Sequence, residues 1–378
     1  MARSRRDGEF HPRFRSLPSI VWPAAVVTDV LPVASPLRFA VFGAGFWTPF
    51  QLSGWREVGG VEPVAIYNRT PEKAEALARE FGIPAVYGDP GRLLREVRPD
   101  FVDNITEIGG HKPLSLLCAK HRVACICQKP LAASYRDAAA IVAAFRATRT
   151  RFFVHENWRW QTPMRQLRQL LAAGTIGTPL RARLSMVSGF DVFAKQPALR
   201  RLDQFILTDL GAHLLDAARV LFGEARTLYC RTARTLAPRV KGENVATVLL
   251  TMGRANTHVT IELGYARTPL EPSSREVFPQ TLAFVEGPAG SIELAADYVV
   301  RLTTRTATRV TRHAPPRYAW ADPRYEVAHA SIVPCCADLL AGLRGTGGGE
   351  TTGEDNLKTL RLVFAAYDSA RSGRAVTL

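Results

Sequence analysis

The stretch Leu37–Gly45, which reads LRFAVFGAG, decides the fold. A short, mostly apolar run with the length of a buried strand leads into a glycine-rich turn, and a helical pattern follows to about Val58. The same alternation continues, with strands expected at 62–67, 85–88, 100–106, 123–127 and 151–156. Helices are expected between them, near 70–82, 90–97, 111–121 and 134–149. Apolar strands that alternate with helices predict a doubly wound parallel sheet covered on both faces.

After residue 158 the alternation gives way to strands that follow one another. They are expected near 180–188, 226–235, 244–252, 256–266, 280–286 and 290–304, with helices near 163–173, 207–222, 329–344 and 354–371. This order predicts an α+β domain, a mostly antiparallel open sheet with helices on one face. We therefore divide the chain into an extension at 1–36, an α/β domain at 37–157, an α+β domain at 158–350 and a closing helix at 351–378 that packs back between the domains.

Composition excludes several classes of protein. The 378 residues suffice for two domains, and 47% apolar with 22% charged residues is an ordinary globular balance. The net charge of +15 raises the question of nucleic-acid binding, but the basic residues are scattered arginines without interleaved aromatic residues. The six cysteines lack zinc spacing, and no apolar stretch reaches the length of a membrane helix. We expect a cytoplasmic protein without metal, membrane or nucleic-acid partners, and an extension 1–36 that contributes little to the core.

The glycine-rich turn has the features of a loop that binds a dinucleotide. Gly43 permits the tight turn, and Gly45 lets a pyrophosphate approach the backbone. The following residues, Phe46 and Trp47, open a helix whose N–H groups attract phosphate. Thr48 stands where such a loop usually has its third glycine, and a purely structural turn is the alternative interpretation. We expect a Rossmann-type domain that binds a nicotinamide dinucleotide here.

The end of the second expected strand bears on the choice of cofactor. Folds that prefer NAD usually place a carboxylate there to hold the ribose 2′-hydroxyl. This chain has Asn68, Arg69 and Thr70 instead. Arg69 can pair with a 2′-phosphate and Thr70 can donate a hydrogen bond to it, so NADP(H) is favoured and NAD(H) is possible. The alternative is that Thr70 only caps the next helix and Arg69 is a solvated surface charge.

Three residues are candidates for the chemistry. Lys129 follows the fifth strand, at the carboxyl edge of a parallel sheet where ligands bind, although a surface lysine would look the same. Asp209 and His213 are four residues apart at the start of an expected helix, so their side chains can address one substrate oxygen or each other. The alternative makes Asp209 an N-cap and His213 a core residue.

Taken in order, these segments resemble the Gfo/Idh/MocA oxidoreductases, the family of glucose–fructose oxidoreductase and inositol dehydrogenase. The resemblance covers the chain from about Leu37 to Leu378 and depends on an ordered set of landmarks. They are GAGFW at 43–47, the Thr106…His111 segment, QKPLA at 128–132, HENWRWQ at 155–161 with GTIG at 174–177, DLGAHLLD at 209–216, and the tail at 351–373.

The resemblance implies roles for individual residues. Lys129, Asp209 and His213 are implied to be catalytic and to contact substrate, with His213 as the acid/base. The residues implied to lie beside the substrate are Trp158, Arg159 and Trp160; those implied to lie beside the cofactor, besides the glycine loop and residues 68–70, are Thr106, His111, Gln128 and Lys129. Gln128 replaces the glutamate usual in the family, and Glu107 replaces a proline.

Together these interpretations predict an enzyme that transfers a hydride between a nicotinamide cofactor and a CH–OH or ketone carbon of a sugar, inositol or similar polyol. The resemblance also favours a homo-oligomer formed through the C-terminal sheet. Two alternatives stay open, namely an NAD-dependent glycosidase of the same fold and a non-catalytic regulator that binds dinucleotide or sugar. A nucleic-acid-binding role is a distant third.

Overall fold

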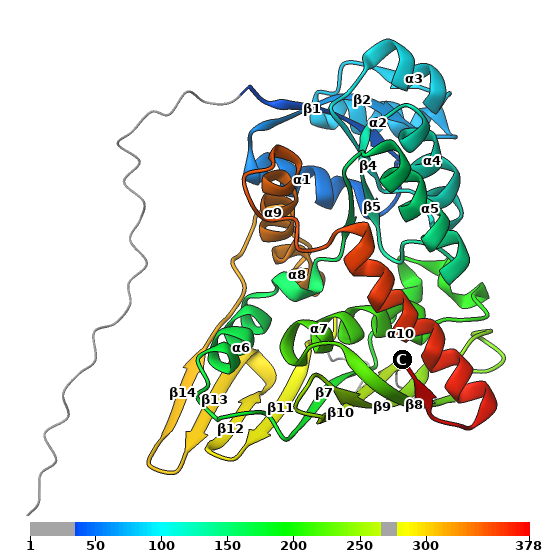
Figure 1. Ribbon diagram of the computed structural model, residues 1–378. Helices are drawn as coiled ribbons and strands as arrows, with labels where there is room; N and C mark the ends of the chain where they lie inside the picture. Colours follow the sequence, from blue (N-terminus) through cyan, green and yellow to red (C-terminus); the bar gives the residue numbers. More distant parts are fainter. Residues whose placement is uncertain (1–34, 266–277) are drawn as a thin grey trace, which may run out of the picture. The chain divides into compact units, whose positions relative to one another are not determined.

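The computed structural model describes residues 35–265 and 278–378, so the expectation for the extension 1–36 falls almost entirely outside the described residues. The first sheet contains six parallel strands in the order β3-β2-β1-β4-β5-β6 (Figure 1). They are β1 Leu37–Phe42, β2 Val61–Tyr67, β3 Val86–Tyr87, β4 Phe101–Asn104, β5 Ala124–Gln128 and β6 Phe152–His155. The order reverses between β1 and β4, and ligands of doubly wound sheets bind at the carboxyl edge beside such a reversal. The expected Rossmann-type sheet is confirmed.

Helices cover both faces of this sheet. They are α1 Thr48–Val58, α2 Pro71–Phe81, α3 Pro90–Val97, α4 Ile108–Lys120 and α5 Tyr135–Thr148. Successive side chains of a strand point to opposite faces. Phe39 and Val41 of β1 accordingly pack with α1 and α2, whereas Ala40 and Phe42 pack with α3, α4 and α5. The apolar strands inferred from the sequence are therefore buried on both faces.

The second sheet has nine strands in the order β14-β13-β12-β11-β7-β10-β9-β8-β15. Their bounds are β7 Arg181–Ser188, β8 Ala225–Ala233, β9 Val245–Met252, β10 Thr257–Tyr265, β11 Leu282–Gly287, β12 Gly290–Leu294, β13 Val299–Thr304, β14 Thr308–Arg312 and β15 Val376–Thr377. Only β7 and β10 pair in parallel; the other neighbouring strands pair in antiparallel fashion. The expected mostly antiparallel open sheet is confirmed.

One expected strand is wrong in detail. The stretch 290–304 forms two strands, β12 and β13, joined by a short turn at Ala296–Tyr298. Asp297 and Tyr298 adopt positive φ angles of 55° and 62° there. Neither residue type marks a turn as glycine or proline does, and the apolar flanks conceal the break. The sequence analysis also did not foresee β14 and β15.

Helices α6 (Thr162–Ala172), α7 (Ala212–Phe222) and α10 (Gly353–Ser372) lie on one face of the second sheet (Figure 1). α7 is preceded by one π-helical turn, Leu207–Gly211, and α6 by a short 3-10 turn, Trp158–Trp160. α10 also contacts α5 and β6 of the first domain. α9 (Ile332–Arg344), which follows α8 (Glu326–Ala330), packs against α1 and its buried side chains join the core of the first sheet.

The helical stretch Pro323–Arg344 is long and apolar enough to cross a membrane by composition alone. However, 67% of its most apolar window is buried inside the protein. Its apolar side chains therefore serve core packing, as those of α9 do.

Candidate active site

The glycine loop lies between β1 and α1 and is open on one side. Gly43 has a φ of 107°, and a Cβ atom there would approach the carbonyl oxygen of Ile105 to 2.9 Å. A Cβ atom on the exposed Gly45 would meet nothing within 4 Å. Thr48, in place of the third glycine, accepts a hydrogen bond from the Gly45 N–H at 3.1 Å and donates one to the Gly43 carbonyl at 3.3 Å. The loop is thus closed by its own threonine and leaves backbone free to approach a pyrophosphate, so these residues fit a dinucleotide.

The rings of Phe46 and Trp47, which the sequence placed beside the cofactor, pack into an aromatic cluster. The Phe46 ring lies 5.7 Å from the ring of Tyr325, and the Trp47 ring lies 5.4 Å from that of His329. Both partners belong to the segment that precedes α9. This packing anchors the loop and leaves the backbone of residues 46 and 47 as the part directed to a cofactor.

Asn68 ties the glycine loop to the end of β2. Its Oδ1 accepts a hydrogen bond from the Ala44 N–H at 3.2 Å, and its Nδ2 donates to the Thr70 carbonyl at 2.8 Å. Arg69 and Thr70 are exposed, and the Thr70 side chain makes no capping hydrogen bond to α2. The capping alternative for Thr70 is therefore not what the structure shows.

His111 joins the loops that follow β4 and β5. Its two ring nitrogens lie 2.9 Å and 2.8 Å from the carbonyl oxygens of Pro130 and Thr106. Burial lowers the pKa of His111, although both carbonyls favour the protonated ring. Thr106 in turn donates a hydrogen bond to Asn104 at 2.7 Å. Thr106 and His111 thus brace the carboxyl edge of the sheet on either side of Lys129.

Lys129 and Asp209 meet across the two domains. The Lys129 Nζ lies 3.2 Å from Asp209 Oδ1 and 3.3 Å from the Asp209 carbonyl oxygen. Their side chains are 19% and 15% exposed. The hydroxyl of Tyr265 donates to Asp209 Oδ2 at 3.4 Å, and burial followed by the charge of Asp209 raises the pKa of this tyrosine well above its usual value. An ammonium group and a carboxylate are therefore held together where solvent still reaches them.

His213 is not held by Asp209. Its Nδ1 lies 2.5 Å from Oε1 of Glu156, the residue directly after β6, and its ring stacks on Trp158 with 4.4 Å between centroids. His213 and Glu156 are 5% and 0% exposed at the side chain. The sequence analysis left open whether Asp209 and His213 address each other; the structure gives each a different partner.

A chain of buried amides supports Lys129 from below. The Lys129 N–H donates to Gln128 Oε1 at 3.1 Å, and Gln128 Nε2 donates to Gln51 Oε1 at 2.5 Å. Gln51 Nε2 reaches both carboxyl oxygens of Asp103 at 2.8 Å. Burial raises the pKa of Asp103 to about 7, against hydrogen bonds from Trp55 and Gln51 that lower it. Gln128 thus acts through its amide hydrogens, which a glutamate would lack.

Comparison with known proteins identifies the family. Residues 37–156 match the family described as "Oxidoreductase family, NAD-binding Rossmann fold", and residues 164–293 match "GFO/IDH/MocA C-terminal domain". The chain is 41% identical over 353 residues to a D-apiose dehydrogenase of Paraburkholderia graminis, covering 93% of this chain and 92% of that protein. The chain belongs to the Gfo/Idh/MocA oxidoreductases. The resemblance inferred from the sequence is confirmed.

Two further relatives agree with this assignment. A D-apiose dehydrogenase of Rhizobium rhizogenes is 38% identical, with 90% of this chain and 97% of that protein covered. A solved oxidoreductase from Agrobacterium radiobacter, in complex with NAD+, L-tartaric acid and magnesium, is 37% identical with a TM-score of 0.86, covering 91% of this chain and 98% of that one. The protein is therefore an NAD(P)-dependent oxidoreductase with a Rossmann-type cofactor domain.

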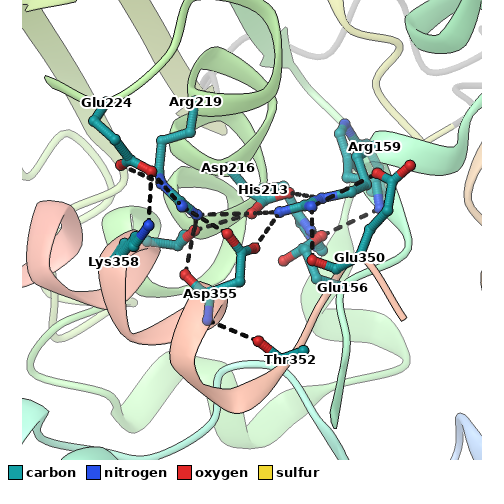
Figure 2. A network of polar contacts seen from close by, with 12 residues as sticks. Glu156, Arg159, His213, Asp216, Arg219, Glu224, Glu350, Thr352, Asp355 and Lys358 are labelled. Carbon is teal, nitrogen blue, oxygen red and sulfur yellow. Dashed lines mark hydrogen bonds and ion pairs between the residues drawn. The ribbon is translucent and has the colours of Figure 1, made fainter. Parts of the chain in front are cut away.

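In this oxidoreductase Arg159 lies in a buried ion-pair network (Figure 2). Its guanidinium contacts Asp216 at 2.6 Å and Asp355 at 2.7 Å, and the side chain is 5% exposed. Arg219 contacts the same Asp355 at 2.7 Å, which links α7 to α10. The sequence placed Arg159 beside the substrate; its hydrogen bonds instead hold elements of the second domain together. Only tertiary structure brings these carboxylates to it.

The two tryptophans beside Arg159 also have defined partners. Trp158 donates its ring N–H to the Thr281 hydroxyl at 2.8 Å and supports His213 by stacking. The ring of Trp160 lies under the guanidinium of Arg165, 4.1 Å from its centroid. Of the three residues expected near substrate, Trp158 alone contacts one of the candidate catalytic residues through an interaction described above.

The sequence analysis missed Glu156 and Tyr265. Glu156 is part of the quoted HENWRWQ segment and directly follows the last strand of the first sheet, where functional side chains gather. That position was a usable signal. Tyr265 ends β10 and carries no local signal, because only the fold brings its hydroxyl to Asp209. Among the described residues, no cluster of His, Cys, Asp or Glu could hold a metal ion.

Proposed function

We propose that this oxidoreductase oxidises a CH–OH group of a sugar or polyol, with D-apiose as the first substrate to test. The single observation that carries the proposal is the partly exposed Lys129–Asp209 pair at the carboxyl edge of the cofactor sheet. Two relatives that match over at least 90% of this chain carry the name D-apiose dehydrogenase. The reverse reduction uses the same groups.

The chain supplies placement and proton transfer. A nicotinamide dinucleotide, when bound, supplies the hydride acceptor. The residues that would hold it are Gly43, Gly45, Asn68, Thr106 and Gln128, either by direct contact or through the loops that they fix.

Lys129 and His213 divide the work on the substrate oxygen. The ammonium group of Lys129 donates a hydrogen bond to that oxygen and stabilises the negative charge that develops on it. Asp209 keeps the ammonium in position at 3.2 Å. His213 accepts the hydroxyl proton, as imidazole can near neutral pH. Trp158 limits the movement of the imidazole by stacking on it.

We favour NADP(H) over NAD(H) as the cofactor. The Asn68 side chain is engaged by Ala44 and Thr70, so the end of β2 offers no carboxylate that would repel a 2′-phosphate. Arg69 is exposed next to it and provides a positive charge. The Agrobacterium radiobacter neighbour contains NAD+, which makes comparative titration of both cofactors essential.

We also propose that copies of the chain associate through the outer face of the nine-stranded sheet. Helices α6, α7 and α10 cover the opposite face, as Figure 1 shows. Large apolar side chains are exposed on the strands of this sheet, namely Val187, Leu249, Leu282, Phe284 and Val310. Apolar groups gathered on one face usually mark an interface. Sedimentation of the protein and of Phe284→Glu tests this: a smaller species for the variant supports it, and an unchanged monomer contradicts it.

A cytoplasmic location is proposed on the state of the cysteines. All six are free and buried, and Cys335 and Cys336 are neighbours without forming a disulfide. Such thiols suit a reducing compartment. Small-molecule substrate and cofactor are the only ligands that the site requires, and cell fractionation tests the location.

The decisive experiment titrates both cofactors and then follows nicotinamide absorbance with D-apiose, other aldoses, inositols and simple polyols. Net formation of reduced cofactor in proportion to sugar consumed supports the proposal. Cleavage of a glycoside without net cofactor turnover would assign the glycosidase alternative. Cofactor binding without turnover of any substrate would assign the regulator alternative.

A further inference from the structure

Glu156 is fixed in the one position from which it can hold the imidazole of His213. Its Oε1 lies 2.5 Å from His213 Nδ1 and also accepts the Trp158 N–H at 3.1 Å (Figure 2). A carboxylate accepts but does not donate hydrogen bonds. The proton on the imidazole therefore sits on Nδ1, and Nε2 is left as the nitrogen that exchanges protons.

The plane of the imidazole is fixed as well. Trp158 stacks on it at 4.4 Å with an interplanar angle of 26°, and Trp158 is itself held by Thr281. His213 is 4% exposed, so the ring cannot turn without displacing core side chains. One face and one nitrogen of His213 are thus constrained by residues outside its own helix.

Asp209 is not available for the same task. Its Oδ1 is bonded to Lys129 and its Oδ2 to Tyr265. Moreover, Leu207–Gly211 is a π-helical turn, so the regular α-helical relation between residues 209 and 213 does not hold across it. The two carboxylates near the candidate site therefore serve two different cationic or basic groups.

The charge of Glu156 is directed at His213. Burial raises the pKa of Glu156, but the charge of His213, the hydrogen bond from its ring and the charge of Lys129 together lower it. The other oxygen, Oε2, is buried and has no donor among the described residues. Asp216 on α7 and His155 on β6 are the other titratable groups that feel this pair. An ionised carboxylate with few donors is strongly stabilised by a protonated imidazole beside it.

We propose that Glu156 is the positioning residue for His213: it sets the ring tautomer and stabilises the imidazolium that forms when His213 takes the substrate proton. This inference rests on the proposed function, since it concerns the proton half of the same oxidation. The substrate hydroxyl proton ends on Nε2, the proton on Nδ1 stays between His213 and Glu156, and the hydride leaves the same carbon for the cofactor.

The first test needs no variant. Nitrogen-15 spectra of histidine-labelled protein, with His213 assigned by comparison with His213→Gln, report which ring nitrogen is protonated. We expect the Nδ1–H form with an unprotonated Nε2 above the pH at which the ring titrates. The Nε2–H form would overturn the proposal, whatever the activity of the enzyme.

The second test is Glu156→Gln, which keeps the shape and removes the charge. We expect kcat to fall about 10²–10³-fold, with KM for the sugar and cofactor affinity changed less than about threefold. The acid limb of the pH–rate profile should move to lower pH, because the imidazolium loses its negative partner. Glu156→Asp, which retains a carboxylate, should recover part of kcat and of the profile.

Glu350→Gln is the matched control, because Glu350 pairs with Arg165 and Arg168 and has no hydrogen bond to His213. It should leave kcat and the pH profile unchanged. If Glu156→Gln keeps wild-type kcat and profile while the wild type turns over sugar, the proposal is wrong and the proposed function stands. If the wild type turns over no substrate at all, the proposed function fails, and the spectra alone then decide the role of Glu156.

Discussion

Two pairs of opposite charge attach the segment Leu207–Phe222 to the preceding part of the chain, and they differ in every physical respect. Lys129 and Asp209 are 3.2 Å apart with side chains 19% and 15% exposed. Arg159 and Asp216 are 2.6 Å apart with side chains 5% and 0% exposed, and Arg159 makes a second contact with Asp216 at 2.8 Å.

The difference separates chemistry from architecture. A buried, doubly bonded guanidinium has spent its hydrogen-bond donors within the protein and stabilises one arrangement of helices. A longer, single contact at a partly wet site leaves the ammonium able to donate to a substrate. The two pairs lie seven residues apart on the same segment, so burial and bonding distinguish them where residue type does not.

The largest effect is expected from breaking the open pair. Lys129→Met removes the donor that faces the substrate oxygen, so kcat should fall by about 10³-fold, or about 4 kcal/mol in the barrier. The free energy of unfolding should change by less than about 1 kcal/mol, since the pair is partly exposed. Lys112→Met, which breaks a pair with Asp137, is the control and should keep full activity. Activity within tenfold of wild type in Lys129→Met would remove Lys129 from the mechanism.

Breaking the buried pair should act on stability. Arg159→Met leaves Asp216 charged and buried, so the free energy of unfolding should fall by about 3–4 kcal/mol in urea titrations. The molecules that remain folded should keep kcat within a few-fold. Arg92→Met, at an exposed pair with Glu96, should cost less than about 1 kcal/mol. Loss of sugar binding without loss of stability would show that Arg159 contacts substrate after all.

Asp103 sharpens the comparison, because it is buried like Asp216 but is bonded to amides and an indole. Its pKa of about 7 lies above its usual 3.8. Between these values the folded state keeps a proton that the unfolded state has lost, so stability from this group falls as pH rises. From pH 5 to 7 the loss is about 2–3 kcal/mol.

Asp103→Asn should remove this pH dependence. The melting temperature of the variant, relative to wild type, should therefore rise between pH 5 and pH 8, whatever its offset at pH 5. Asp368→Asn, at an exposed pair, should show no such trend. A constant difference across this range would mean that Asp103 is ionised throughout.

The smallest effect concerns the exposed charge at the cofactor edge. Arg69→Ala should weaken NADP(H) binding about tenfold, or about 1.4 kcal/mol, because solvent screens the contact. NAD(H) binding should be unchanged, as should both affinities in Arg79→Ala on the exposed side of α2. Fluorescence titration measures all of these. Equal losses for both cofactors in Arg69→Ala would contradict the NADP(H) assignment.

The elements and their order followed from the sequence because each depends on local patterns. α3 has the expected bounds, and α2 begins at Pro71 and ends before Gly82, whose φ is 68°. The alternation of β1 between two cores likewise follows from its apolar residues. The sequence also placed Lys129 and Asp209 together, since each follows an element that ends at the same edge.

The partners of His213 and Arg159 could not be read in the same way. Glu156 and His213 are 57 residues apart, and Arg159 and Asp355 are 196 apart. Such pairings depend on how helices pack, and the regular spacing of Asp209 and His213 pointed to a different one. The π-helical turn before α7 breaks the α-helical geometry that this interpretation assumed.

The position of Asp355 on α10 has a consequence for how the protein is made. Ribosomes add about 5–20 residues per second, so the 196 residues that separate Arg159 from Asp355 take roughly 10–40 s to synthesise. During that interval Arg159 and Arg219 await a carboxylate that both contact in the finished protein. The first sheet can form early on the ribosome, but the support beneath His213 is completed only when α10 emerges. A nascent chain stalled before that point would hold a cofactor domain without a finished catalytic helix.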